Sequence, residues 1–146
     1  MSKIKYISFN DALLVYEKTI EKSGGGFSGV RDKGGIESVL NFIQNDEYYP
    51  DFNSKLSYLV FRFCSGHFFN DGNKRIALTL GAYFLHKNGH FWAALQFMQR
   101  MEAIVYHIAA SRIDNKLLLR IINCVVECAD FDERTQMDII NAMLKT

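Results

Sequence analysis

The sequence predicts a single all-helical domain, a helical bundle that spans residues 1–146. Apolar residues recur at three- and four-residue spacings along most of the 146-residue chain, as on the buried face of an amphipathic helix. Only one proline, Pro50, interrupts these patterns, and proline is the residue that most strongly ends helices. A chain of this length buries about two thirds of the surface it exposes when unfolded, and 49% of its residues are hydrophobic.

The first two helices follow from a cap and from apolar stripes. Ser8 and Asp11 are spaced as in a capping box, which predicts that a helix begins there. That helix ends at three consecutive glycines, residues 24–26, which form a flexible connection. A second helix is indicated by apolar residues at i, i+3, i+4 and i+7, namely Ile36, Val39, Leu40 and Ile43.

The segment after the second helix is aromatic and prone to turns. Residues 46–52 are Asp-Glu-Tyr-Tyr-Pro-Asp-Phe, and a proline beside aspartates favours a turn over a continued helix. We interpret this run as a short exposed flap. A third helix begins at Asn53 or Ser54, carries a full apolar stripe and ends near Gly66.

The second half of the chain predicts four further helices. One begins near Asn73 and ends at Asn88, because the Gly that follows is suited to a left-handed cap. The next helix spans roughly residues 95–111. Two C-terminal helices follow from about residue 114, over roughly residues 116–127 and 134–144. The last helix has an apolar side that either packs on the domain or meets a partner, formed by Met137, Ile140 and Leu144.

Charge and cysteine content exclude several classes of protein. Seventeen Lys and Arg balance sixteen Asp and Glu, so no global attraction to nucleic acid or to an anionic membrane is indicated. Three cysteines without a CxxC pair predict free thiols in a reducing compartment. No apolar stretch approaches the ~18 residues of a membrane span, and the N-terminus lacks the pattern of a secretion signal. We therefore expect a cytoplasmic protein that binds neither membranes nor nucleic acid directly.

The start of the fourth helix departs from the rules of helix formation. It opens with Asn73, Lys74 and Arg75, although the partial positive charge of a helix N-terminus favours acidic residues. An uncompensated cation there costs about 0.3–1 kcal/mol. The same arrangement becomes favourable when a phosphate occupies the helix end, because backbone N–H groups, the helix dipole and both cations then face one anion. The pattern predicts a local anion site.

The residues before this helix supply the chemistry that a phosphate site needs. Gly72 allows the backbone to approach a ligand closely, and Asp71 offers an oxygen ligand of the kind that Mg²⁺ prefers. His67 is the only nearby group that accepts a proton at neutral pH. Phe68 or Phe69 would anchor the loop in the core so that His67 faces the site.

Each of these residues also has a plain structural explanation. Asp71 could be an N-cap, His67 a hydrogen-bonded helix end, and the two cations of the fourth helix a solvated face. Five polar residues of complementary chemistry within nine positions nevertheless favour a functional site. A P-loop is excluded because five residues instead of four separate Gly66 from Gly72, and no Ser or Thr follows the lysine.

The run from His67 to Arg75, His-Phe-Phe-Asn-Asp-Gly-Asn-Lys-Arg, resembles the Fic/Doc signature HxFx(D/E)(G/A)N(K/G)R. The similarity is closest to death-on-curing (Doc) toxins, and it extends to residues 29–38 and 82–89 and over roughly residues 6–120. It implies one Fic/Doc domain over residues 1–146, with its motif loop at 67–75. In that fold, the loop and the helix after it bind a nucleotide phosphate.

The resemblance also implies a role for each motif residue. His67 would deprotonate a hydroxyl of a target protein, and Asp71 would hold Mg²⁺, with ATP or another nucleoside triphosphate as co-substrate. The run from Tyr48 to Phe52 would be the flap that positions the target by strand pairing. The nucleotide phosphates would be bound by Gly72, Asn73, Lys74 and Arg75.

Two transfer reactions are open within this family, beside an inactive anion-binding module. Lys74 is what Doc toxins carry, and there the cation turns the nucleotide so that its γ-phosphate passes to a translation factor, elongation factor Tu. We favour this kinase reaction, in which Lys74 counts with His67 as catalytic. AMP transfer is the alternative, since Gly72 is Fic-like and Ser65 also departs from the Doc pattern.

Control of such an activity would come from outside the chain. The self-inhibiting motif (S/T)xxxE(G/N), which supplies a blocking glutamate in Fic proteins, is absent from the sequence. The resemblance therefore implies a Phd-like antitoxin as partner, whose disordered tail folds into a groove on the toxin.

Overall fold

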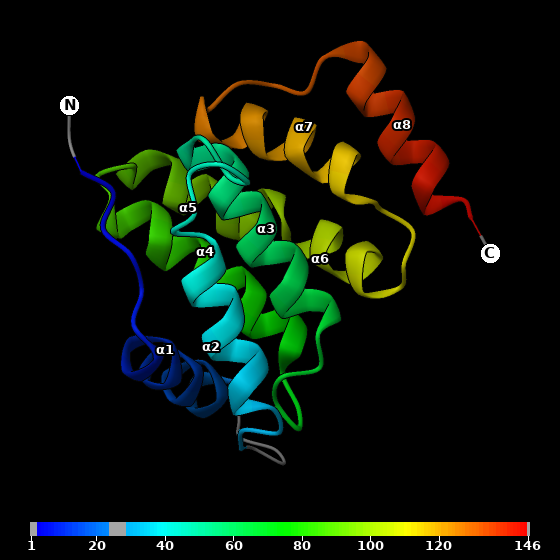
Figure 1. Cartoon of the computed structure of the whole chain (residues 1–146). Helices are drawn as coiled ribbons and strands as arrows, with labels where there is room; N and C mark the ends of the chain where they lie inside the picture. The colour runs from blue at the N-terminus through cyan, green and yellow to red at the C-terminus, as the bar shows by residue number, and fades with distance from the viewer. Residues whose placement is uncertain (1–2, 24–28, 146) are drawn as a thin grey trace.

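The computed structural model describes residues 3–23 and 29–145, and the three glycines predicted to form a connection lie outside these ranges. Within them the chain forms eight α-helices and no strand, which confirms the all-helical fold (Figure 1). The helices are α1 (Phe9–Lys22), α2 (Lys33–Phe42), α3 (Phe52–Ser65), α4 (Asn73–Lys87), α5 (Phe91–Arg100), α6 (Glu102–Ala109), α7 (Asn115–Val126) and α8 (Glu133–Met143).

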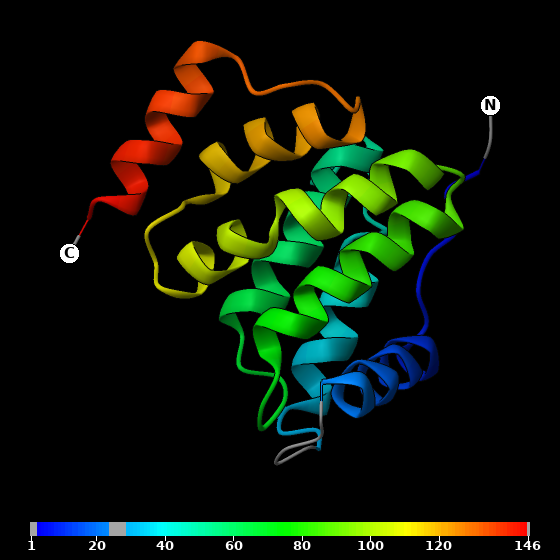
Figure 2. The same ribbon diagram turned by 180° about the vertical axis from the view of Figure 1, so that it is seen from behind.

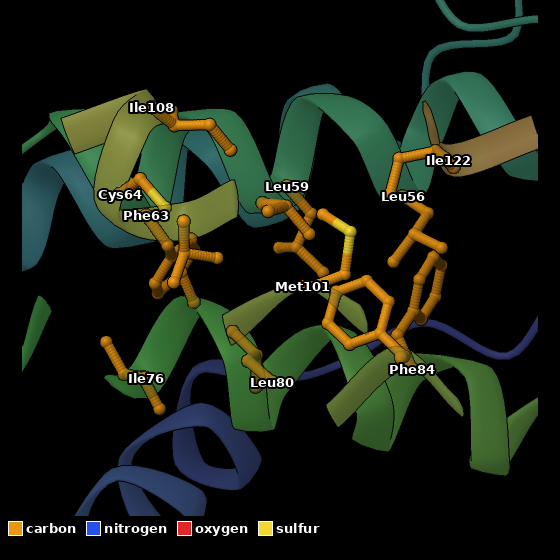
Figure 3. Close-up of a cluster of buried hydrophobic side chains, with 14 of the residues drawn as sticks. Leu56, Leu59, Phe63, Cys64, Ile76, Leu80, Phe84, Met101, Ile108 and Ile122 are labelled. Carbon is orange, nitrogen blue, oxygen red and sulfur yellow. The ribbon is translucent and has the colours of Figure 1, made fainter. Parts of the chain in front are cut away.

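Helix α3 lies in the middle of the bundle and determines where the motif loop sits. It packs against α2, α4, α6 and α7, as the two opposite views show (Figures 1 and 2). Figure 3 shows its buried face meeting that of α4, with Met101 filling the space between them. Because burial of apolar surface is the main force that holds helices together, the motif loop between α3 and α4 is fixed at both ends.

Most helices begin as their sequences predict. The Ser8 hydroxyl accepts a hydrogen bond from the Asp11 N–H at 3.1 Å, so α1 begins at its predicted cap. Asp51 and Ser54 form a capping box, which starts α3 slightly before the predicted position. Helix α4, which follows its N-cap Gly72, begins like α5 without a side-chain cap and without an acidic residue in its first turn.

The single helix predicted over residues 95–111 is wrong. Two helices, α5 and α6, meet at the fully buried Met101. The buried residues Phe97, Met101, Val105 and Ile108 continue at helical spacing through the break, so the apolar pattern does not reveal it. The bend lets α5 pack against α4 and α7, while α6 packs against α3 and α4.

The predicted flap does not lie beside the motif loop. Residues 48–51 precede α3 and the motif loop follows it, so the 14 residues of this helix separate the two by about 20 Å. In Figure 1 the two segments lie at opposite ends of α3. Residues 43–51 form turns, tied down by the buried Lys55, whose Nζ donates to Ile43 O and to Asp46 Oδ1, both at 2.7 Å. The flap assigned to residues 48–52 is therefore misplaced.

The C-terminal helix packs on the domain through one face only. Arg120 of α7 holds it by donating to Asp138 at 2.6 Å and to Thr135 at 3.1 Å. Its apolar side, which the sequence left unassigned, faces away from α7, with Met137 50%, Ile140 48% and Leu144 74% exposed.

The three cysteines are free, as predicted. None of the helices in residues 3–23 and 29–145 combines the length and the apolar character that crossing a bilayer requires.

Candidate active site

The motif loop turns sharply at His67. This residue has a left-handed backbone, φ 53°, which costs a residue other than glycine about 1–3 kcal/mol. Phe68 and Phe69 follow, each 1% exposed, and Phe68 packs edge-on against Phe63 with ring centroids 5.2 Å apart. Both phenylalanines thus anchor the loop, and His67 is left exposed on the outer side of the turn.

The main chain of the loop is held from both sides. The Asn73 side chain accepts a hydrogen bond from the Phe69 N–H at 3.1 Å and donates to the Phe69 carbonyl at 3.0 Å. On the other side, Val30 forms an antiparallel bridge with Phe69, and the Phe68 carbonyl accepts from the N–H of Arg31 at 2.8 Å. Residues 29–32, and not the predicted flap, therefore pair with the motif loop.

This arrangement changes what Asn73 can offer to a ligand. Its amide is already paired with Phe69, so its contribution to phosphate binding would come from the backbone N–H. No hydrogen bond recorded for the described residues uses the N–H groups of Asn73, Lys74 or Arg75. Three unpaired donors and two cations thus lie at one helix end, an arrangement that favours the binding of an anion.

Asp71 lies at the edge of this helix end and is half-exposed. Its Oδ1 accepts from the Gly72 N–H at 2.8 Å, and its Oδ2 lies 3.5 Å from Arg75. Gly72 is the N-cap residue, so Asp71 is not the ordinary cap that was the alternative interpretation. Among the residues that the structure describes, no cluster of three or more His, Cys, Asp or Glu could hold a metal ion. The single carboxylate of Asp71 is chemically the kind of ligand that Mg²⁺ accepts beside substrate phosphates.

All of the predicted site residues meet in one pocket. A cavity of about 350 Å³ is lined by His67 and by the run from Asn70 to Arg75, together with Cys64 and Ala109. The recorded hydrogen bonds of the described residues include none to the His67 imidazole, so the alternative of a hydrogen-bonded helix end does not apply. The exposed imidazole thus lines the pocket without a recorded protein partner in the described ranges.

Sequence reasoning missed two features of this pocket. Cys64 is buried and also lines the pocket, where burial raises the pKa of its thiol to about 12 although Lys74 acts to lower it. A thiol with that pKa stays protonated and acts as an apolar wall. The second feature is Tyr16 of α1, whose ring stacks on Phe69 with centroids 3.9 Å apart. Helical spacing predicts that Tyr16 is buried, but no local signal identifies a partner so distant in the sequence.

Comparisons with known proteins agree with this geometry. The model of the Fic/DOC family matches residues 6–85, which include α1 to α3, the whole motif loop and most of α4. The protein kinase Doc of Escherichia phage P1 is 32% identical over 90 residues, which cover 59% of this chain and 70% of that protein. No solved structure matches significantly. The matched segment thus carries every residue that lines the pocket except Ala109, and the chain belongs to the Fic/DOC family.

Proposed function

We propose that this protein transfers the γ-phosphate of a nucleoside triphosphate, ATP in the first instance, to a hydroxyl of a target protein. The observation that carries the proposal is the shared pocket of His67 and the uncapped cationic start of α4. The cationic start of α4 in this pocket suits a polyphosphate. His67, which lines the same pocket, is the proton acceptor. The similarity to a protein named as a kinase supports the same reaction.

In this reaction His67 acts as the general base. A ring nitrogen takes the proton of the target hydroxyl while the hydroxyl oxygen bonds to the γ-phosphorus. The bond from that phosphorus to the β–γ bridging oxygen breaks, and the nucleoside diphosphate leaves. The N–H groups of Asn73, Lys74 and Arg75, together with both cations, stabilise the negative charge on the phosphates. Mg²⁺, when held by Asp71, neutralises part of this charge.

Lys74 decides which phosphorus faces the base. Its side chain is exposed at the mouth of the pocket, where it occupies room that a nucleotide turned the other way would need. The alternative reaction is AMP transfer, and Gly72, the Fic-like residue of the motif, favours it. The two reactions use the same base and the same helix end, so only the transferred group separates them.

Isotopic labelling separates these reactions directly. Purified protein is incubated with ATP labelled at the γ or the α position, first with cell lysate and then with purified elongation factor Tu as the proposed target. Protein-bound label from the γ position supports the kinase, and label from the α position shows AMP transfer. If neither label becomes bound to protein although the chain binds ATP, the chain is an inactive anion-binding module. His67→Asn serves as the inactive control, because asparagine tolerates a left-handed backbone.

Restraint of this activity belongs to the same proposal. The sequence holds no self-inhibiting glutamate motif, so we assign the restraint to a Phd-like antitoxin in the cytoplasm, where a translation factor is modified. Expression of the chain alone should stop growth, and His67→Asn should abolish the arrest. If the folded and catalytically active chain left growth unaffected when expressed alone, the proposal of an antitoxin would be wrong.

A further inference from the structure

Tyr16 connects helix α1 to the metal-binding end of the motif loop. The residue is 1% exposed, and its ring stacks on Phe69 with an interplanar angle of 16°. Its hydroxyl donates a 2.8 Å hydrogen bond to the main-chain carbonyl of Asp71. One side chain thus touches the loop at two residues, on either side of the exposed Asn70.

The carbonyl that Tyr16 holds belongs to the same peptide unit as the Gly72 N–H. A trans peptide is planar, and its C=O and N–H point in opposite directions. Tyr16 donates to the C=O at one edge of this peptide, and the Asp71 carboxylate accepts from the N–H at the opposite edge, each at 2.8 Å. If this peptide rotates, the Gly72 N–H and the Asp71 carboxylate that accepts from it therefore change direction together.

The other contacts of the loop do not hold this peptide. The Asn73 side chain and residues 29–32 bind the main chain at positions 68–70. Within the described ranges, the hydrogen bond between the Asp71 main chain and a neighbouring helix comes from Tyr16 of α1. The phenolic hydroxyl of Tyr16 thus ties the Asp71–Gly72 peptide to helix α1.

We propose that Tyr16 is a positioning residue, which orients the Asp71 carboxylate for the Mg²⁺ of the bound nucleotide. The inference rests on the proposed function only in its assumption that Asp71 meets a metal–nucleotide complex. Without the phenolic hydroxyl, the peptide turns more freely, and the carboxylate spends less time in the orientation that binds the metal. The effect appears in the dependence of nucleotide binding on metal concentration.

The test compares two conservative substitutions on α1. Tyr16→Phe keeps the ring and its stacking but removes the hydroxyl. Thr19→Val is the matched control, since it removes a buried hydroxyl that bonds Thr79 of α4 at 2.8 Å and Val15 O at 2.7 Å without touching the motif loop. Calorimetry measures the affinity for a non-hydrolysable ATP analogue at several Mg²⁺ concentrations, and thermal unfolding measures stability.

We expect Tyr16→Phe to raise the Mg²⁺ concentration needed for half-maximal affinity by roughly three- to tenfold, the effect of losing one hydrogen bond. Thr19→Val should lower the midpoint of thermal unfolding and leave the Mg²⁺ dependence unchanged. In an Asp71→Asn background, Tyr16→Phe should have no further effect on that dependence. These three results together would support the positioning role.

Equal shifts in Mg²⁺ dependence for Tyr16→Phe and Thr19→Val would overturn the proposal, since Tyr16 would then act only through stability. The absence of any shift would overturn it as well, and so would wild-type binding that is indifferent to Mg²⁺. The labelling experiment decides the function separately. A chain that binds the metal–nucleotide through Tyr16 and Asp71 yet transfers no label would refute the proposed transfer and leave this inference standing.

Discussion

Gly72 packs directly on Ile20 of helix α1, so closely that a Cβ at position 72 would lie 2.6 Å from the Ile20 Cδ1. Gly72 also has a left-handed backbone, φ 79°, which side chains rarely adopt. The sequence suggested that this glycine makes room for a ligand. The structure adds a second reason, because the glycine lets the start of α4 rest on α1.

Substitution of Gly72 should separate these two constraints. Gly72→Ala should lower the free energy of unfolding by about 1–2 kcal/mol, mainly through the left-handed backbone. Ile20→Val alone should cost about 0.5–1.5 kcal/mol. The double variant should lose less stability than the two single variants added together, because the valine at position 20 lacks the Cδ1 that the new methyl group would meet. Chemical denaturation measures all three. Full additivity would show that Ile20 moves aside without cost.

Replacement of the proposed base should affect chemistry and spare binding. His67→Asn keeps a residue suited to the left-handed backbone, so the loop should retain its shape while the proton acceptor is lost. We expect kcat to fall by about 10²–10⁴, with the affinity for nucleotide within about twofold of wild type. Single-turnover transfer and calorimetry provide the two values. Unchanged transfer would remove His67 from its role.

Lys74 should control which group is transferred. In Lys74→Gly the side chain that crowds the mouth of the pocket is gone, so γ-phosphate transfer should weaken and AMP transfer should become detectable with α-labelled ATP. Lys87→Ala is the control, because it removes a cation at the opposite end of the same helix. If γ-transfer survived in Lys74→Gly at the wild-type rate, the orientation argument would be wrong.

Cys64 should make the protein less stable at high pH. Burial raises its pKa from 9.0 to about 12, so between these values the unfolded chain loses a proton that the folded chain keeps. The free energy of unfolding therefore falls as pH rises through this window, by up to about 1.4 kcal/mol per pH unit. Below pH 9 this contribution is fully present.

Denaturation at several pH values between 8 and 11 tests this dependence. Cys64→Ala should show a shallower loss of stability than wild type, whatever its stability at pH 8. The exposed Cys128 is the control, so Cys128→Ala should keep the wild-type slope. Tyr49, whose pKa burial raises to about 12, contributes equally to all three proteins. Parallel curves for Cys64→Ala and wild type would show that the thiol titrates alike in both states.

The motif and the helices around it could be predicted because their signals are local. A cap such as Ser8 acts on an N–H three residues away, and the apolar stripe of α3 depends only on helical spacing. The cationic start of α4 was likewise visible as a departure from a local rule. The predicted residues do share one pocket, although the sequence could not show that the Asn73 amide is already paired with Phe69.

What the sequence determined by itself is the helical class, most helix ends and the composition of the phosphate loop. The tertiary structure alone decided the break at Met101, the position of the segment that pairs with the loop, and the support that Tyr16 and Ile20 give to Asp71 and Gly72. The reason is physical. Caps and stripes arise from interactions within a few residues, whereas these features depend on which faces meet when separate helices pack, and no short-range pattern encodes that.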